Sequence, residues 1–134
     1  MSDDIEIIRA EGTILCYIIR RTFLPSHTTF ITPPESKQQV GFVVYPKDGK
    51  IARHSHRSLE RHLVGLSEVL LVREGHCQIE IYDNQHHLVA TRDLLEKDVV
   101  IMEAGGHGFR IIEDTVLLEI KQGPYLGVND KELF

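Results

Sequence analysis

The hydrophobic positions of this chain fall in short runs that turn residues separate. Apolar or alternating segments recur at intervals of about 8 to 12 residues, the spacing expected of an all-β sandwich or barrel. Helical periodicity is nearly absent, apart from one helical turn expected around Leu59–Leu63. The predicted strands are Ile5–Arg9, Thr13–Arg20, Thr28–Thr32, Gln39–Tyr45, Lys50–His56, Ser67–Arg73, Gln78–Tyr82, His87–Arg92, Val99–Met102, Phe109–Ile112 and Thr115–Lys121.

The length of the chain is consistent with one domain around one core. About ten short, mostly antiparallel strands must close on themselves or stack as two sheets to protect their edges. A chain of 134 residues buries enough surface to fold without a disulfide or a metal. We therefore expect a single domain over residues 1–134, with N-terminal strands (1–49), a central core (50–121) and a polar C-terminal tail (122–134).

The net charge and the absence of targeting segments limit the expected binding partners and cellular location, and the two cysteines have a predicted structural role. Twenty acidic and 15 basic residues give a net charge of -5 without a marked Lys/Arg run, so neither nucleic acid nor an anionic membrane is expected as a partner. No signal-peptide profile and no apolar run of the ~18 residues that a membrane span requires are visible, so a cytoplasmic location is expected. Cys16 and Cys77 lie in apolar segments and are predicted to be core residues.

Histidines supply the candidate chemistry. His54 and His56 are one residue apart, so on an extended backbone their imidazoles project to the same face. Glu68 heads the apolar run that follows, and His107 lies in a glycine-rich stretch downstream. Three imidazole nitrogens and one carboxylate form a ligand set suited to a divalent transition metal (Fe, Mn, Ni, Co, Cu or Zn) without selecting among them.

These motifs resemble those of the cupins, a family of small double-stranded β-helix or jelly-roll proteins. The first cupin motif pairs His-x-His with a Glu and then a Gly, and here Gly75 lies seven residues after Glu68. The second motif has an apolar strand, a glycine loop and a His. The segment 97–109 of this chain is similar to it. The resemblance implies a cupin-like jelly-roll barrel, a metal at His54, His56, Glu68 and His107, and a homodimer.

The sequence departs from the cupin pattern in its spacing. Eleven residues separate His56 from Glu68, which is longer than in typical cupins, so this loop is expected to bulge outward. Glu60 stands at the usual shorter spacing and competes for the carboxylate role. We favour Glu68, because the strand that follows it and Gly75 fix its register.

Further residues are candidates for a ligand pocket. Glu119 and Lys121 alternate with apolar residues on the last predicted strand, and such a charged face usually meets solvent. In a cupin-like barrel this face would line the cavity mouth, where Lys121 holds a carboxylate or sugar hydroxyl and Glu119 transfers a proton. Gln39, Phe42 and Phe109 are weaker candidates for the same cavity.

Three functions are compatible with these residues. The first is a metal-dependent enzyme that isomerises, epimerises or dioxygenates a small molecule, such as a carbohydrate or a carboxylate. The second is a metal-independent sugar-nucleotide isomerase or epimerase, with His54 or His56 as base and Glu68 or Lys121 as acid. The third is a ligand-binding or sensing module without turnover. A ligand set by itself does not identify the reaction.

Overall fold

The protein is all-β, as the hydrophobic pattern predicts, in a computed structural model that describes residues 3–134 apart from the side chains of residues 128 and 129. The described strands are β1 (Ile5–Ala10), β2 (Thr13–Ile19), β3 (Thr29–Phe30), β4 (Gly41–Phe42), β5 (Glu68–Glu74), β6 (His76–Tyr82), β7 (Leu88–Leu95), β8 (Val99–Met102), β9 (Gly106–Ile111) and β10 (Val116–Lys121), followed by one 3-10 helix, η1 (Gly127–Asp130).

The chain divides into two compact units. The first unit runs up to Phe23 and resumes over Leu66–Phe134, and the second unit is Leu24–Gly65. Within residues 3–134, no helix has the length and apolar character that a membrane-spanning helix needs.

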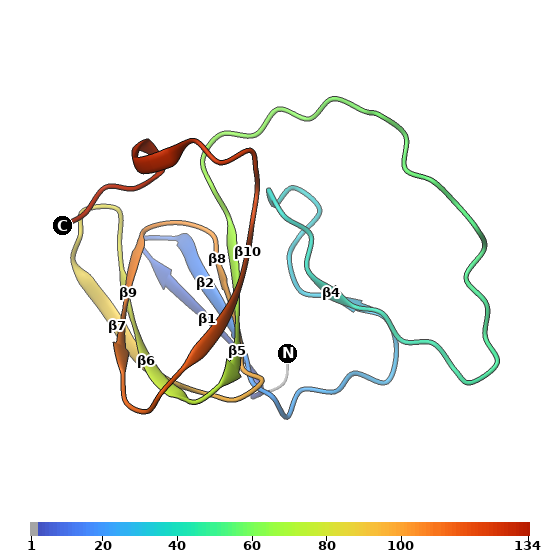
Figure 1. Ribbon diagram of the computed structural model, residues 1–134, viewed down its shortest axis with the longest axis horizontal. Coiled ribbons are helices and arrows are strands. Elements are labelled where there is room, and N and C mark those ends of the chain that lie inside the picture. The colour runs from blue at the N-terminus through green and yellow to red at the C-terminus, as the bar shows by residue number, and fades with distance from the viewer. Residues whose placement is uncertain (1–2) are drawn as a thin grey trace. The chain divides into compact units, whose positions relative to one another are not determined.

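The first unit consists of two antiparallel sheets (Figure 1). One sheet has five strands in the order β1-β2-β8-β5-β10, and the other has three in the order β7-β6-β9. The described strands do not close into a barrel, because β9 and β10 are edge strands of different sheets and do not pair. The predicted jelly-roll barrel is therefore observed only as far as an arrangement of two sheets.

The core lies between these two sheets and follows the period-2 alternation of their strands. On β6, Cys77, Ile79 and Ile81 are completely buried, while the residues between them are only partly covered. Leu70 and Val72 of β5 belong to the same hydrophobic cluster. Burying each large aliphatic side chain contributes roughly 1.5–3 kcal/mol.

Cys16 and Cys77 are buried and free, as their apolar surroundings predict. Cys16 belongs to the same core cluster as Cys77, and neither forms a disulfide. Both side chains therefore act as small hydrophobic residues of the core.

An ion pair ties the outer strands of the two sheets on one side of the core. Arg92 of β7 donates hydrogen bonds from Nε and Nη2 to the carboxylate of Glu6 on β1, the shortest of them 2.7 Å. Two-pronged arginine–carboxylate contacts fix orientation as well as distance. The side of the unit where β9 and β10 lie has no pairing between its edge strands.

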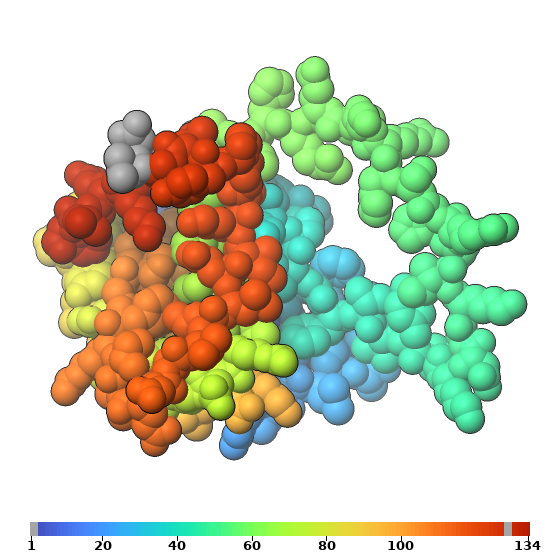
Figure 2. All heavy atoms as spheres, in the orientation of Figure 1, coloured from blue at the N-terminus to red at the C-terminus, as the bar shows by residue number. Residues whose placement is uncertain are grey.

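The second unit contains much less regular structure than the sequence predicts. The strand expected over Gln39–Tyr45 is reduced to β4, which pairs with β3. The strand expected over Lys50–His56 and the helical turn expected at Leu59–Leu63 are both wrong, because residues 50–64 contain neither strand nor helix. In Figure 2 this green segment is a single row of residues, and each of them is exposed.

The composition of the segment explains this outcome. Between Lys50 and His56 only Ile51 and Ala52 are apolar, and they are adjacent, so a strand here has no continuous apolar face to bury. Without such a face, hydrophobic burial does not offset the entropy lost when a backbone is ordered, which is about 1–2 kcal/mol per residue.

Two boundaries in the first unit also differ from the prediction. The strand predicted over Phe109–Ile112 begins three residues earlier, because β9 starts at Gly106. The strand predicted over His87–Arg92 continues as β7 to Leu95, because Leu94 is buried in the core. The first difference places His107 inside a strand, with a fixed direction.

Candidate functional site

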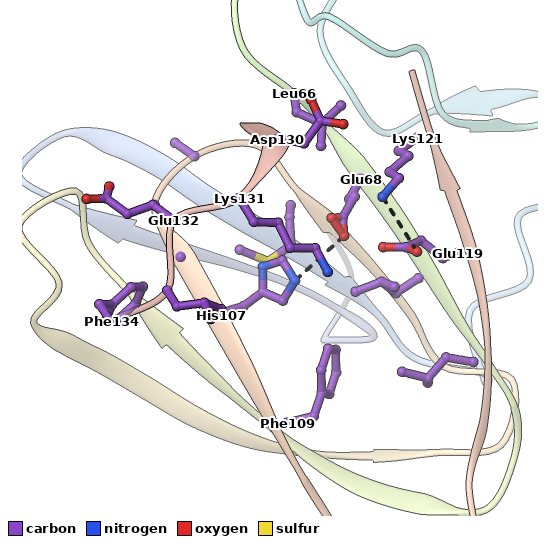
Figure 3. Close-up of a pocket in the computed structure, with 17 residues that line it drawn as sticks. Leu66, Glu68, His107, Phe109, Glu119, Lys121, Asp130, Lys131, Glu132 and Phe134 are labelled. Carbon is purple, nitrogen blue, oxygen red and sulfur yellow. Dashed lines mark ion pairs between the residues drawn. The ribbon is translucent and has the colours of Figure 1, made fainter. Parts of the chain in front are cut away.

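A cavity of about 630 Å³ lies in the first unit, between the five-stranded sheet and β9 (Figure 3). One wall comes from β5, β8 and β10, and β9 supplies the facing wall. Residues that follow η1 cover part of the opening. The lining residues are Leu66, Glu68, Leu70, Met102, Ala104, Gly105, Gly106, His107, Phe109, Leu117, Glu119, Lys121, Asp130, Lys131, Glu132, Leu133 and Phe134.

Glu68 points into this cavity because it shares a face of β5 with buried apolar residues. Strand alternation places it on the same side as Leu70 and Val72. Its cross-strand neighbours are Lys121 of β10 and Met102 of β8. The preceding residue, Ser67, is fully buried, and these contacts hold the start of β5 in place.

His107 reaches the same cavity from the opposite sheet. It pairs across the ladder with Ile81 of β6, whose side chain is fully buried, and therefore lies on the inner face of β9. Its Nε2 atom is 3.7 Å from Oε1 of Glu68. Figure 3 shows the imidazole and the carboxyl group facing each other across the cavity. The structure thus brings together two of the four residues that the sequence analysis assigns to one site, and their role as metal ligands stays a prediction.

The surroundings of Glu68 favour its protonated form. Burial raises the pKa of this carboxyl from the ordinary value of 4.5 to about 7, and the hydrogen bond and negative charge of Glu119 act in the same direction. The positive charges of Lys121 and Lys131 oppose this shift. Glu68 therefore exchanges a proton near neutral pH, unlike an exposed glutamate.

The surroundings of His107 favour the neutral imidazole. Burial lowers the pKa of His107 below its usual 6.5; the charge of Glu119 raises it and that of Lys131 lowers it further. At neutral pH the cavity thus holds a neutral imidazole beside a carboxyl group that is partly protonated. Such a pair contains both a proton acceptor and a proton donor.

Glu119 and Lys121 line the cavity from β10, and their side-chain N and O atoms lie 3.9 Å apart. The alternating residues Leu118 and Ile120 point away and are about half exposed, at 49% and 47%. The charged face of this strand is thus the one that faces the cavity, whereas charged faces usually meet solvent.

The other predicted metal ligands lie in the second unit. His54 and His56 are exposed, and their rings are 5.3 Å apart in an edge-on arrangement. Nδ1 of His54 is 2.8 Å from the carbonyl oxygen of Ala52. Glu60, the competing carboxylate, is exposed in the same irregular segment.

The predicted pocket residues are divided in the same way. Phe109 lines the cavity and its ring packs edge-on against that of His107, with 5.7 Å between the centroids. Gln39 and Phe42 belong to the second unit, where the Gln39 amide donates hydrogen bonds to the carbonyl oxygens of Pro33, Pro34 and Ser36. Gln39 therefore has a structural role in that loop.

The described residues do not assemble a group of metal ligands in the cavity. In the part of the chain that the structure describes, no three His, Cys, Asp or Glu side chains are grouped closely enough to hold one. The cavity lining combines the ammonium groups of Lys121 and Lys131 with the carboxyl groups of Glu68, Glu119, Asp130 and Glu132. The four-residue metal site remains a prediction, and the function proposed below does not depend on it.

Sequence reasoning missed the residues after η1 that line the cavity, among them Lys131 and Phe134. The segment was described as a polar tail, although it ends in Leu133 and Phe134. Two adjacent large apolar residues in an otherwise polar tail were the available signal, since such a pair gains free energy by packing against the domain.

Comparison with known proteins identifies no relative. No family model matches this sequence, and no curated protein and no solved structure is significantly similar to it.

Proposed function

We propose that the protein binds a small organic molecule in the cavity and transfers protons on it without a metal, as isomerases and epimerases do. The observation that carries this proposal is the Glu68–His107 pair, which spans the cavity at 3.7 Å. A volume of about 630 Å³ lies within the range of small-molecule sites, and its walls combine apolar and charged groups as such sites do.

His107 acts as the base and Glu68 as the acid in the proposed reaction. The neutral imidazole of His107 accepts a proton from a carbon beside a carbonyl group, while Glu68 donates its proton to the carbonyl oxygen, so no net charge develops. His107 then returns its proton to the former carbonyl carbon while Glu68 takes up the proton of the neighbouring hydroxyl group, which completes an isomerisation. An epimerisation requires instead that a proton donor on the opposite face reprotonates the original carbon while Glu68 takes back the enol proton. In the sequence-based version of this mechanism His54 or His56 was the base; the geometry favours His107.

The cupin-like jelly roll also remains our proposal for the fold of the first unit. It is supported by the position of Glu68 at the head of β5 and of His107 on β9, the places that the two cupin motifs imply. An experimental structure in which β9 and β10 pair and the strands close would support the barrel.

Deuterium incorporation tests the proposed function. We would incubate the protein with chelator in D₂O, together with small aldoses, ketoses and 2-keto acids, and follow exchange at carbon by NMR. The wild type should catalyse exchange in at least one of them, and Glu68→Gln or His107→Asn should slow it about 10²- to 10⁴-fold. Glu74→Gln, at the exposed end of the same strand, is the matched control.

The outcomes separate the three functions. Exchange that survives chelation supports metal-independent proton transfer, whereas exchange that requires an added transition metal supports the metal-dependent enzyme. Saturable binding without any exchange supports a binding module and would refute the proposal.

A further inference from the structure

Residues 130–134, here called the strap, extend along the open side of the cavity, and each of its residues lines the cavity. The strap begins at Asp130, the last residue of η1, whose carboxylate accepts a hydrogen bond of 3.1 Å from the backbone N–H of Leu126. Figure 3 shows the strap passing in front of β9, with the side chain of Lys131 directed toward His107. The strap is therefore positioned to contact whatever occupies the cavity.

Phe134 fixes the end of the strap in an aromatic slot. Its ring stacks on that of His86, with centroids 3.9 Å apart and planes within 2°, and meets Tyr82 edge-on at 5.1 Å. The slot also requires Gly106, since a Cβ atom at this position would lie 2.9 Å from the Phe134 ring. Aromatic pairs of this kind contribute roughly 0.5–1.5 kcal/mol beyond their buried area, which is enough to hold the strap closed and still allow it to open.

Lys131 brings a positive charge to the cavity. Among the residues that the structure describes, it forms no ion pair, whereas the other cavity lysine, Lys121, lies 3.9 Å from Glu119. The charge of Lys131 nevertheless acts on both members of the central pair, Glu68 and His107. The Lys131 ammonium is therefore available to an anion bound beside this pair.

The remaining walls indicate what kind of anion fits. Leu70, Met102, Phe109 and Leu117 provide apolar surface for a hydrocarbon chain. The charged groups of the lining are the ammonium groups of Lys121 and Lys131 and the carboxyl groups of Glu68, Glu119, Asp130 and Glu132. With so many carboxyl groups nearby, the cavity suits a monoanion better than a phosphate dianion, which they would repel more strongly.

We propose that the cavity binds a small aliphatic carboxylate, that Lys131 binds the carboxylate group, and that the strap closes over the ligand when Phe134 occupies its slot. This inference deepens the proposed function and concerns the same cavity. A charge-assisted hydrogen bond from Lys131, formed in a partly enclosed site, is stronger than one in open water.

Butyrate and butyramide are suitable probes, because they differ in charge but hardly in shape. We would titrate each into the protein and follow the backbone amide signals of cavity residues by NMR. Butyrate should bind saturably and about tenfold more tightly than butyramide, and Lys131→Gln should remove about that tenfold advantage. Lys97→Gln, at an exposed lysine that does not line the cavity, should leave butyrate binding unchanged.

The contact of Phe134 with its aromatic slot is tested separately by hydrogen exchange. Phe134→Ala should accelerate amide exchange in residues 131–133 by about tenfold and weaken butyrate binding, while Phe134→Tyr should retain both properties. An unchanged amide spectrum of β5, β6 and β8 would show that the variants remain folded.

Three results would overturn the inference: equal affinity for butyrate and butyramide, no effect of Lys131→Gln, or butyrate shifts confined to residues outside the cavity. These outcomes are distinct from a failure of the proposed function. Selective butyrate binding without any proton exchange would retain the anion site and refute only the proposed chemistry.

Discussion

Replacing Glu68 by Gln should make the protein more stable at alkaline pH and change little at acid pH. The carboxyl is buried, with only 12% of its side chain exposed, and its pKa is raised to about 7 by burial and by Glu119. The folded protein therefore holds the Glu68 proton more tightly than the unfolded chain, in which the ordinary value of 4.5 applies.

The magnitude follows from linkage between proton binding and folding. Each tenfold difference in proton affinity corresponds to about 1.4 kcal/mol, so a shift from 4.5 to about 7 corresponds to about 3 kcal/mol. Below pH 4.5 both states are protonated and no penalty exists. As the pH rises from 4.5 to 7, this group lowers the free energy of unfolding of the wild type, and the penalty is complete above pH 7. A glutamine side chain does not titrate, so the Glu68→Gln variant lacks this penalty.

Urea denaturation followed by circular dichroism is the appropriate assay, because the chain contains no tryptophan. The free energy of unfolding of Glu68→Gln, relative to wild type, should increase by about 3 kcal/mol between pH 4.5 and pH 8. The control Glu74→Gln, on the exposed end of β5, should show no comparable increase. A difference between Glu68→Gln and wild type that does not change with pH would refute this account of the cavity.

Three further predictions concern the fold and the metal site. Gly75→Ala should cost about 2–4 kcal/mol in thermal or urea denaturation, because Gly75 has a φ of 103° and a Cβ atom would collide with the carbonyl oxygen of Asp114; an unaffected midpoint would contradict this reasoning. Arg92→Ala should cost at most about 1 kcal/mol, since this ion pair is partly exposed and solvent screens it, and a loss of several kcal/mol would argue for a larger role. If the metal site predicted from sequence forms, elemental analysis should find about one transition metal per chain in the wild type and none in the His54→Ala/His56→Ala double variant; a wild type without metal would count against it.

Alternation made most strands of the first unit predictable from sequence. The strands predicted over Ser67–Arg73 and Gln78–Tyr82 are observed as β5 and β6, and β6 shows the clearest alternation of buried apolar and less buried polar residues. The two strands follow each other in sequence but lie in different sheets, so they do not form a hairpin. The same period, together with the cupin-like motifs, led to Glu68 and His107, which do meet in one cavity.

The remainder depends on contacts that no local pattern encodes. The apolar residues of Gln39–Tyr45 suggested a strand, yet Val43 and Val44 are exposed because strand formation stops after Phe42. The strap was missed for the same reason, since only the folded arrangement brings Phe134 to the ring of His86. Local periodicity predicts which residues form a strand, but not which distant segment covers a cavity.

The two edges of the first unit differ in a way that matters for ligand entry. Arg92 and Glu6 fasten one margin, whereas β9 and β10 diverge on the other without a shared hydrogen-bond ladder. In a continuous barrel, the number of strands and their stagger fix the internal diameter. Here the distance between β9 and β10 can change without breaking any backbone pairing between them. The size of the ligand that the cavity accommodates can therefore be adjusted between these two edge strands.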